Sequence, residues 1–124
     1  MSVVTCVILH CNYAEDYTEL SDRDGRRDRR YKGVESLNEW LNSGGRDHGR
    51  LFFMNPHAGG TQTFSGAVFM GAFNYLDLDA FAEQIKTFPW DEPGQVQLFV
   101  REDEDETFWE YDLGLDSPDD SDDN

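Results

Sequence analysis

Cysteine and histidine are the side chains of this sequence best suited to chemistry, and Cys6, His10 and Cys11 lie within one short segment. These residue types bind zinc, and a cysteine thiolate activated by a histidine is a nucleophile. Residues 3–9 are almost all apolar and rich in β-branched types, which predicts a strand covered on both faces. In such a strand Cys6 and His10 point to one side and Cys11 to the other. We therefore predict neither a metal site nor a catalytic cysteine.

The two cysteines are also too far apart to form a disulfide with each other. At the rise of an extended strand, Cys6 and Cys11 would be separated by ~16 Å, beyond the reach of a disulfide. Because no basic leader precedes them, we expect reduced thiols and a cytoplasmic protein. The apolar start is much shorter than the ~20 residues of a membrane-spanning helix, so no membrane contact is expected.

Two motifs resemble ligand-binding loops only in part. Asp22, Asp24 and Gly25 lack the glycine and glutamate spacing of a calcium-binding loop. The segment 59–61 contains two glycines but lacks the lysine and the following helix of a phosphate-binding loop. We interpret the first motif as part of a solvated loop and the second as a turn, and we predict no cofactor.

Negative charge is the strongest feature of the composition. The chain has 26 acidic and 10 basic residues among 124, for a net charge of -16. The C-terminal half has almost no cations, so direct binding of nucleic acid is not expected there. Arginines do cluster at 22–30, but interleaved aspartates weaken their field, and we interpret the run as a solvated loop. Such a charge favours solubility and the electrostatic steering of a basic partner.

Apolar spacing and turn residues predict the strands and helices that must position these groups. Asp77 and Pro89 mark the two ends of the second helix. Expected strands are 3–9, 50–54, 67–73, 96–100 and 109–113, and expected helices are 34–41 and 78–88. A long exposed loop is expected over 12–32. This order predicts an α+β, ferredoxin-like βαββαβ sandwich with an extra C-terminal edge strand, an antiparallel sheet and two helices on one face. We predict one domain, 1–115, and a disordered acidic tail, 116–124.

The leading functional hypothesis is a non-catalytic protein that docks on a basic protein through its acidic hairpin. Inhibitors, immunity proteins and nucleic-acid mimics act in this way on nucleases, toxins or nucleic-acid-binding proteins, and aromatic side chains beside carboxylates supply anchors. The expected docking residues are Glu102, Asp103, Glu104, Asp105, Glu106, Phe108, Trp109, Glu110, Tyr111 and Asp112.

Three alternatives stay open at this stage. In the first alternative, the negative charge serves only to keep the protein soluble or to protect an edge of the sheet from pairing with another strand. The chain is instead a small-molecule-binding or enzymatic ferredoxin-like domain, with a pocket near His48 and His57. Finally, the arginine-containing loop meets the acidic surface of another copy, which makes a homodimer possible.

Overall fold

The computed structural model describes residues 4–21, 27–61 and 65–115. Three sequence predictions therefore fall wholly or partly outside the described residues. They are the acidic motif of Asp22, Asp24 and Gly25, the first part (22–26) of the arginine-rich run 22–30, and the tail 116–124.

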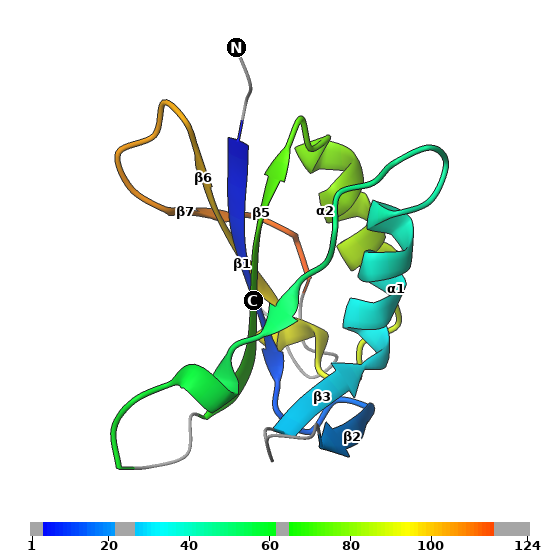
Figure 1. Ribbon diagram of the computed structural model, residues 1–124, viewed down its shortest axis with the longest axis vertical. Coiled ribbons are helices and arrows are strands. Elements are labelled where there is room, and N and C mark those ends of the chain that lie inside the picture. Colours follow the sequence, from blue (N-terminus) through cyan, green and yellow to red (C-terminus); the bar gives the residue numbers. More distant parts are fainter. Residues whose placement is uncertain (1–3, 22–26, 62–64, 116–124) are drawn as a thin grey trace, which may run out of the picture.

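The core of the structure is a five-stranded sheet whose neighbouring strands are all antiparallel (Figure 1). Its order is β4-β5-β1-β6-β7, so the N-terminal strand is central, as predicted. The strands are β1 (Val4–Asn12), β4 (Phe52–Phe53), β5 (Gly66–Asn74), β6 (Gln97–Glu102) and β7 (Trp109–Tyr111).

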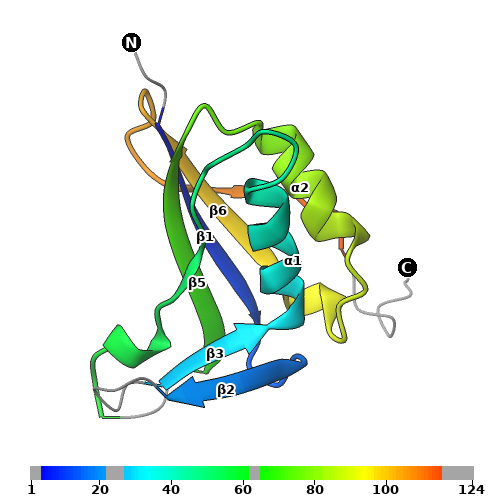
Figure 2. The ribbon, with the colours of Figure 1, turned by 45° about the vertical axis from the view of Figure 1, so that its right-hand side comes forward.

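Two helices, α1 (Lys32–Leu41) and α2 (Leu78–Thr87), cover the same face of this sheet (Figure 2). Each helix is amphipathic and turns its apolar side to the sheet, which places Val34 and Phe81 in the core. The start of α2 is fixed as predicted, because the Asp77 carboxylate accepts a hydrogen bond from the Ala80 N–H. Short 3₁₀ turns, η1 (Asn55–His57) and η2 (Pro93–Gln95), precede β5 and β6.

Among the described residues, only one face of β1 is fully buried, so the prediction of a strand covered on both faces is wrong. Exposure alternates along the strand, and Thr5, Val7, Leu9 and Cys11 are the buried residues. The intervening side chains are half-buried on the face without helices. The sequence misled us because apolar residues occupy both faces of β1, and apolar side chains are not confined to protein interiors.

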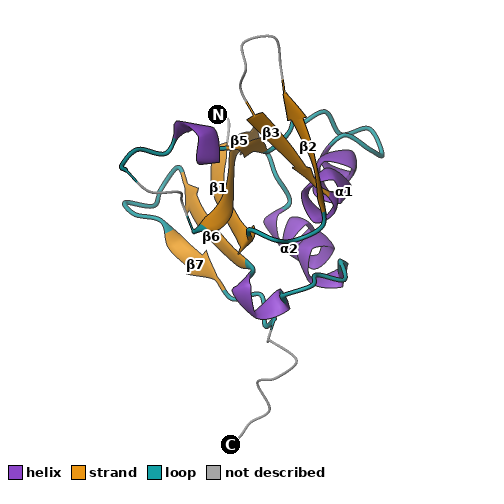
Figure 3. Ribbon diagram, turned by 90° about the horizontal axis from the view of Figure 1, so that it is seen from below, coloured by secondary structure: helices purple, strands orange, loops and turns teal. Residues whose placement is uncertain are grey.

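The predicted loop over 12–32 is also wrong in part, because it contains a hairpin of β2 (Tyr17–Ser21) and β3 (Arg27–Tyr31) (Figure 3). Tyr31 is fully buried, with its ring centroid 5.5 Å from that of Phe69 in the core. The Arg29 guanidinium lies 4.0 and 4.1 Å from the ring centroids of Tyr13 and Tyr17. Aromatic packing and cation–π contacts thus order a segment whose charges suggested a solvated loop.

The structure confirms an α+β protein with an antiparallel five-stranded sheet and two helices. It does not confirm the ferredoxin-like βαββαβ order, because the β2–β3 hairpin separates β1 from α1. The strand expected at 50–54 is also reduced to the two residues of β4. Beyond β4, the Met54 N–H still donates to the Val68 carbonyl at 2.8 Å. From Asn55 on a side chain replaces the backbone pairing, because the Asn55 amide donates to the Gly66 carbonyl and accepts from the Val68 N–H.

Candidate functional site

The acidic hairpin forms where it was predicted, and Asp105 holds its turn. One oxygen of the Asp105 carboxylate accepts the backbone N–H of Glu102 at 2.9 Å and the indole N–H of Trp109 at 2.8 Å. These two hydrogen bonds, with the charge of Arg101, hold the pKa of Asp105 below its usual range. The turn is therefore a structured anionic loop with an ionised carboxylate at its centre.

The other acidic side chains of the turn are more exposed, although the Asp103 carboxylate also accepts the backbone N–H of Val4 at 3.2 Å. Asp103, Glu104 and Glu106 are exposed, and none of them has a cation within ion-pair distance among the described residues. Beside them the side chain of Phe108 is 43% exposed and that of Trp109 is 39% exposed. Carboxylates next to exposed rings combine charge with apolar area, the combination found at protein-binding surfaces.

The ten predicted docking residues do not share one face, because side chains alternate along β7. Trp109 and Tyr111 point to the helix side, where their rings stack with centroids 5.9 Å apart. The Tyr111 hydroxyl donates to the Asp79 carboxylate of α2 at 2.7 Å, and this hydrogen bond raises the pKa of Tyr111. Glu110 points to the opposite side, toward the partner strand's Phe99 and Gln97. The structure thus divides the predicted surface between a turn and two strand faces.

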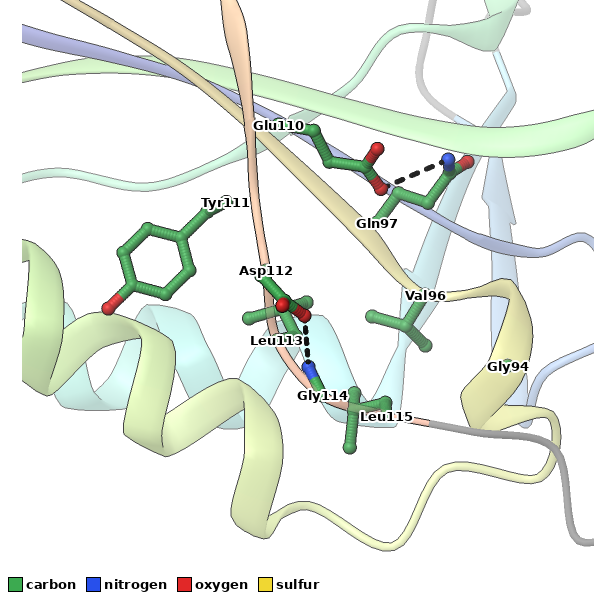
Figure 4. Close-up of a pocket in the computed structure, with 9 residues that line it drawn as sticks. All are labelled: Gly94, Val96, Gln97, Glu110, Tyr111, Asp112, Leu113, Gly114 and Leu115. Carbon is green, nitrogen blue, oxygen red and sulfur yellow. Dashed lines mark hydrogen bonds between the residues drawn. The ribbon is translucent and has the colours of Figure 1, made fainter.

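A polar cavity of about 310 Å³ adjoins the far end of the hairpin (Figure 4). Its lining residues are Gly94, Val96, Gln97, Glu110, Tyr111, Asp112, Leu113, Gly114 and Leu115. The Glu110 carboxylate accepts from the Gln97 amide at 3.4 Å, and Asp112 accepts the Gly114 N–H at 3.0 Å. Two carboxylates at one cavity favour a cationic side chain as its occupant.

Sequence analysis found two acidic residues of this cavity but not the cavity itself. The chain after β7 turns back at Gly114, whose φ of 67° favours glycine, and so returns beside η2. Gly114 was the one sign in the sequence that the chain turns here. The sequence could not show that this turn builds a cavity, because segment 94–97, distant in sequence, forms the other wall.

The whole chain was also compared with proteins of known family and structure. No family model, curated protein or solved structure matches it. Among the described residues, no group of three or more histidine, cysteine or acidic side chains is arranged to hold a metal ion. No helix within the described segments is long and apolar enough to cross a membrane.

The cysteine and histidine residues of β1 are separated as the strand periodicity predicted. Cys11 is fully buried on the helix side, and burial, followed by the charge of Glu15, raises the pKa of its thiol to about 12. Cys6 is half-buried on the opposite face. His10 lies on that face too, and its Nδ1 donates to the Gln95 carbonyl at 2.9 Å. Burial and the raised pKa make Cys11 a poor nucleophile.

The two loop histidines lie at opposite ends of β5. The His48 ring packs edge-on against Phe73, with centroids 6.2 Å apart. His57 instead lines a small apolar pocket of about 210 Å³ with Val68. Among the described residues, His57 thus lines this pocket while His48 packs near the other end of β5, and a small-molecule site near the two histidines stays a prediction.

Proposed function

We propose that this chain is a non-catalytic binding protein that docks on a basic protein through its β6–β7 hairpin. Inhibition or protection of a nuclease, a toxin or another nucleic-acid-binding protein is the role that suits such a surface. The observation that carries the proposal is the Asp105 bridge, because it organises the acidic turn before any partner arrives. A pre-organised loop loses less conformational entropy when it binds.

Three features of the hairpin support a basic partner. The exposed carboxylates of the turn attract cations over a distance and accelerate encounter. Phe108 and Trp109 offer apolar area at the same place. The cavity beside Glu110 and Asp112 has the polarity to accept one lysine or arginine side chain. Steering, anchoring and a specific cation site together would distinguish docking from mere solubility.

The test removes charge from the turn without removing its organising residue. A triple variant, Asp103→Asn, Glu104→Gln and Glu106→Gln, keeps Asp105 and its two hydrogen bonds. We expect it to retain much less basic protein from host lysate than the wild type at low salt. Salt should also lower the capture of the wild type more steeply than that of the variant, because screening acts on exposed charges.

A matched control removes the same charge elsewhere. Glu39→Gln, Asp47→Asn and Asp91→Asn change exposed carboxylates outside the hairpin. Their capture should match that of the wild type. Equal loss in both triple variants would mean that total charge alone decides capture. Undiminished capture by the turn variant would refute the docking site.

For the fold, we propose that the ferredoxin-like plan applies to β1, α1, β4, β5, α2 and β6, with the β2–β3 hairpin as an insertion and β7 as an added edge strand. The neighbours β5, β1 and β6 in an antiparallel sheet, and two helices on one face, support this reading. A fold of this kind is compatible with many functions and does not select among them.

A further inference from the structure

The face of the sheet opposite α1 and α2, here called the open face, carries a row of large apolar side chains. Strand register aligns Phe52 with Met70, Met70 with Ile8, and Ile8 with Phe99, so the row crosses four strands. Phe52 is 61% exposed and Met70 is 39% exposed, while Ile8 and Phe99 are half-buried. A contiguous apolar patch on such a charged protein indicates an interaction surface.

The neighbouring row on the open face is made of smaller side chains. Ala72 and Cys6 are aligned there, followed by Arg101 on β6. A second copy can be placed face to face with the first, with the two-fold axis between the two sheets. If that axis runs perpendicular to the strands and midway between the two rows, Met70 lies opposite the second copy's Ala72. The same axis would set Ile8 opposite the second copy's Cys6. In this arrangement a large side chain packs against a small one, and the two-fold symmetry repeats each contact. Such self-complementarity is what an interface between two identical surfaces requires.

The charges on the open face also favour a second copy of this chain. Of the described strand residues that point to this face, Arg101 and Glu110 are the ones with opposite permanent charges, and the rest are uncharged or histidine. The face is therefore locally neutral on a chain of net charge -16. The two-fold arrangement places Glu110 near the second copy's Arg101 and sets the two acidic turns at opposite ends.

We propose that the open face is a self-association surface through which the protein forms a two-fold, face-to-face dimer. Association through an edge strand of this sheet is less favourable. The edge strand β4 has two residues and β7 has three, and short edge strands resist pairing with another chain. The inference does not rest on the proposed docking function, although Glu110 belongs to both surfaces: in the dimer Glu110 faces the second copy's Arg101, and a basic partner then meets the acidic turn and Asp112. The acidic turns lie at the two ends of such a dimer.

Sedimentation velocity over a concentration series, at low and high salt, tests the dimer directly. The expected species has twice the 14.3 kDa mass of the chain. Salt should strengthen it, because screening weakens the repulsion between two strongly anionic copies. Docking on a basic protein has the opposite salt dependence, so the two proposals fail separately. A monomer at every concentration and salt would overturn the dimer.

Substitutions locate the interface. Met70→Glu and, independently, Ala72→Glu should weaken dimerisation by about tenfold or more, since each buries a carboxylate in the apolar rows. Ser36→Glu is the control, because Ser36 is exposed on α1, on the opposite side of the sheet from the open face. It adds the same charge and should leave the dimer unchanged. A dimer that resists both open-face variants, or that Ser36→Glu disrupts equally, would overturn the assignment of the face.

The Cys6 thiol gives a readout that does not depend on mutant folding. In the dimer Cys6 lies beneath the second copy's Ile8, so its maleimide labelling should slow as protein concentration rises. Ala72→Glu, at an exposed position that tolerates a larger side chain, should restore fast labelling. A labelling rate independent of concentration, in protein shown to be dimeric, would exclude the open face as the interface.

Discussion

The Glu15 carboxylate accepts the backbone N–H of Glu92 at 2.7 Å and, through its other oxygen, that of Asp91 at 3.0 Å. Glu15 is only 4% exposed although it is charged. It follows β1, whereas its two partners lie after α2, so one side chain joins segments far apart in the sequence. The contact closes the end of the structure where the β2–β3 hairpin meets the chain entering β6.

Glu15→Ala should therefore destabilise the fold, because it leaves two backbone N–H groups without their acceptor. We expect a loss of about 3 kcal/mol in the free energy of unfolding, since hydrogen bonds to charged groups contribute about 1.5–3 kcal/mol each. Glu15→Gln, which keeps an acceptor oxygen, should lose less. Chemical denaturation checks both values.

Asp16→Ala provides the control for that experiment. Its carboxylate pairs with Lys32 at 2.8 Å, but both side chains are well exposed. Exposed ion pairs contribute little, so stability should hardly change. If Asp16→Ala and Glu15→Ala were equally harmful, the role given to the Glu15 bridge would be wrong.

Gly33→Ala should destabilise the start of α1. A Cβ at Gly33 would lie 2.4 Å from two atoms of the Trp90 ring. That ring cannot move freely, because its indole N–H donates to the Ile85 carbonyl at 2.8 Å. Overpacking of this kind costs about 1–3 kcal/mol, which thermal or chemical unfolding would measure. Gly59→Ala, with open space around the new methyl group, should leave stability nearly unchanged.

The parts of the fold that sequence analysis predicted depend on local patterns. Helix α2 combines a capping Asp77 with an apolar stripe, and the β6–β7 hairpin has alternating residues on both sides of a polar turn. The β2–β3 hairpin was missed because its decisive contact, Tyr31 against Phe69, joins segments distant in sequence. The open face was missed for a related reason. An apolar residue such as Ile8 gives the same sequence pattern whether or not a helix covers its side of the strand.

The candidate site also has one part that the sequence predicts and another that it does not. An acidic turn with neighbouring aromatic residues is visible in the sequence, and the structure places it in a hairpin as expected. The bridging role of Asp105 among five consecutive acidic residues is not visible, because it depends on which carboxylate meets the Glu102 N–H and the Trp109 indole. The cavity beside Glu110 depends in the same way on two separate segments meeting.

The two thiols should differ sharply in reactivity. Burial raises the pKa of Cys11 to about 12, so this thiol stays protonated at neutral pH as well as being shielded. Dilute native protein should take up maleimide at Cys6 alone, and Cys6→Ser should leave it unlabelled. Mass spectrometry of the labelled protein gives the count, and labelling in denaturant should reach both residues of the wild type. Rapid native labelling of Cys11 would show that the end of β1 opens readily.

The Asp105 bridge should give the acidic turn a defined response to acid. The pKa of Asp105 is lowered in the folded state, so its contribution is present above the unfolded-state pKa and is lost as pH falls through the lower folded value. The indole N–H resonance of Trp109 should therefore stay constant through the pH range in which ordinary aspartates titrate, and shift only below it. Asp105→Asn should remove that late transition and broaden the resonance at every pH. A Trp109 signal that titrates with the ordinary aspartates would contradict the bridge.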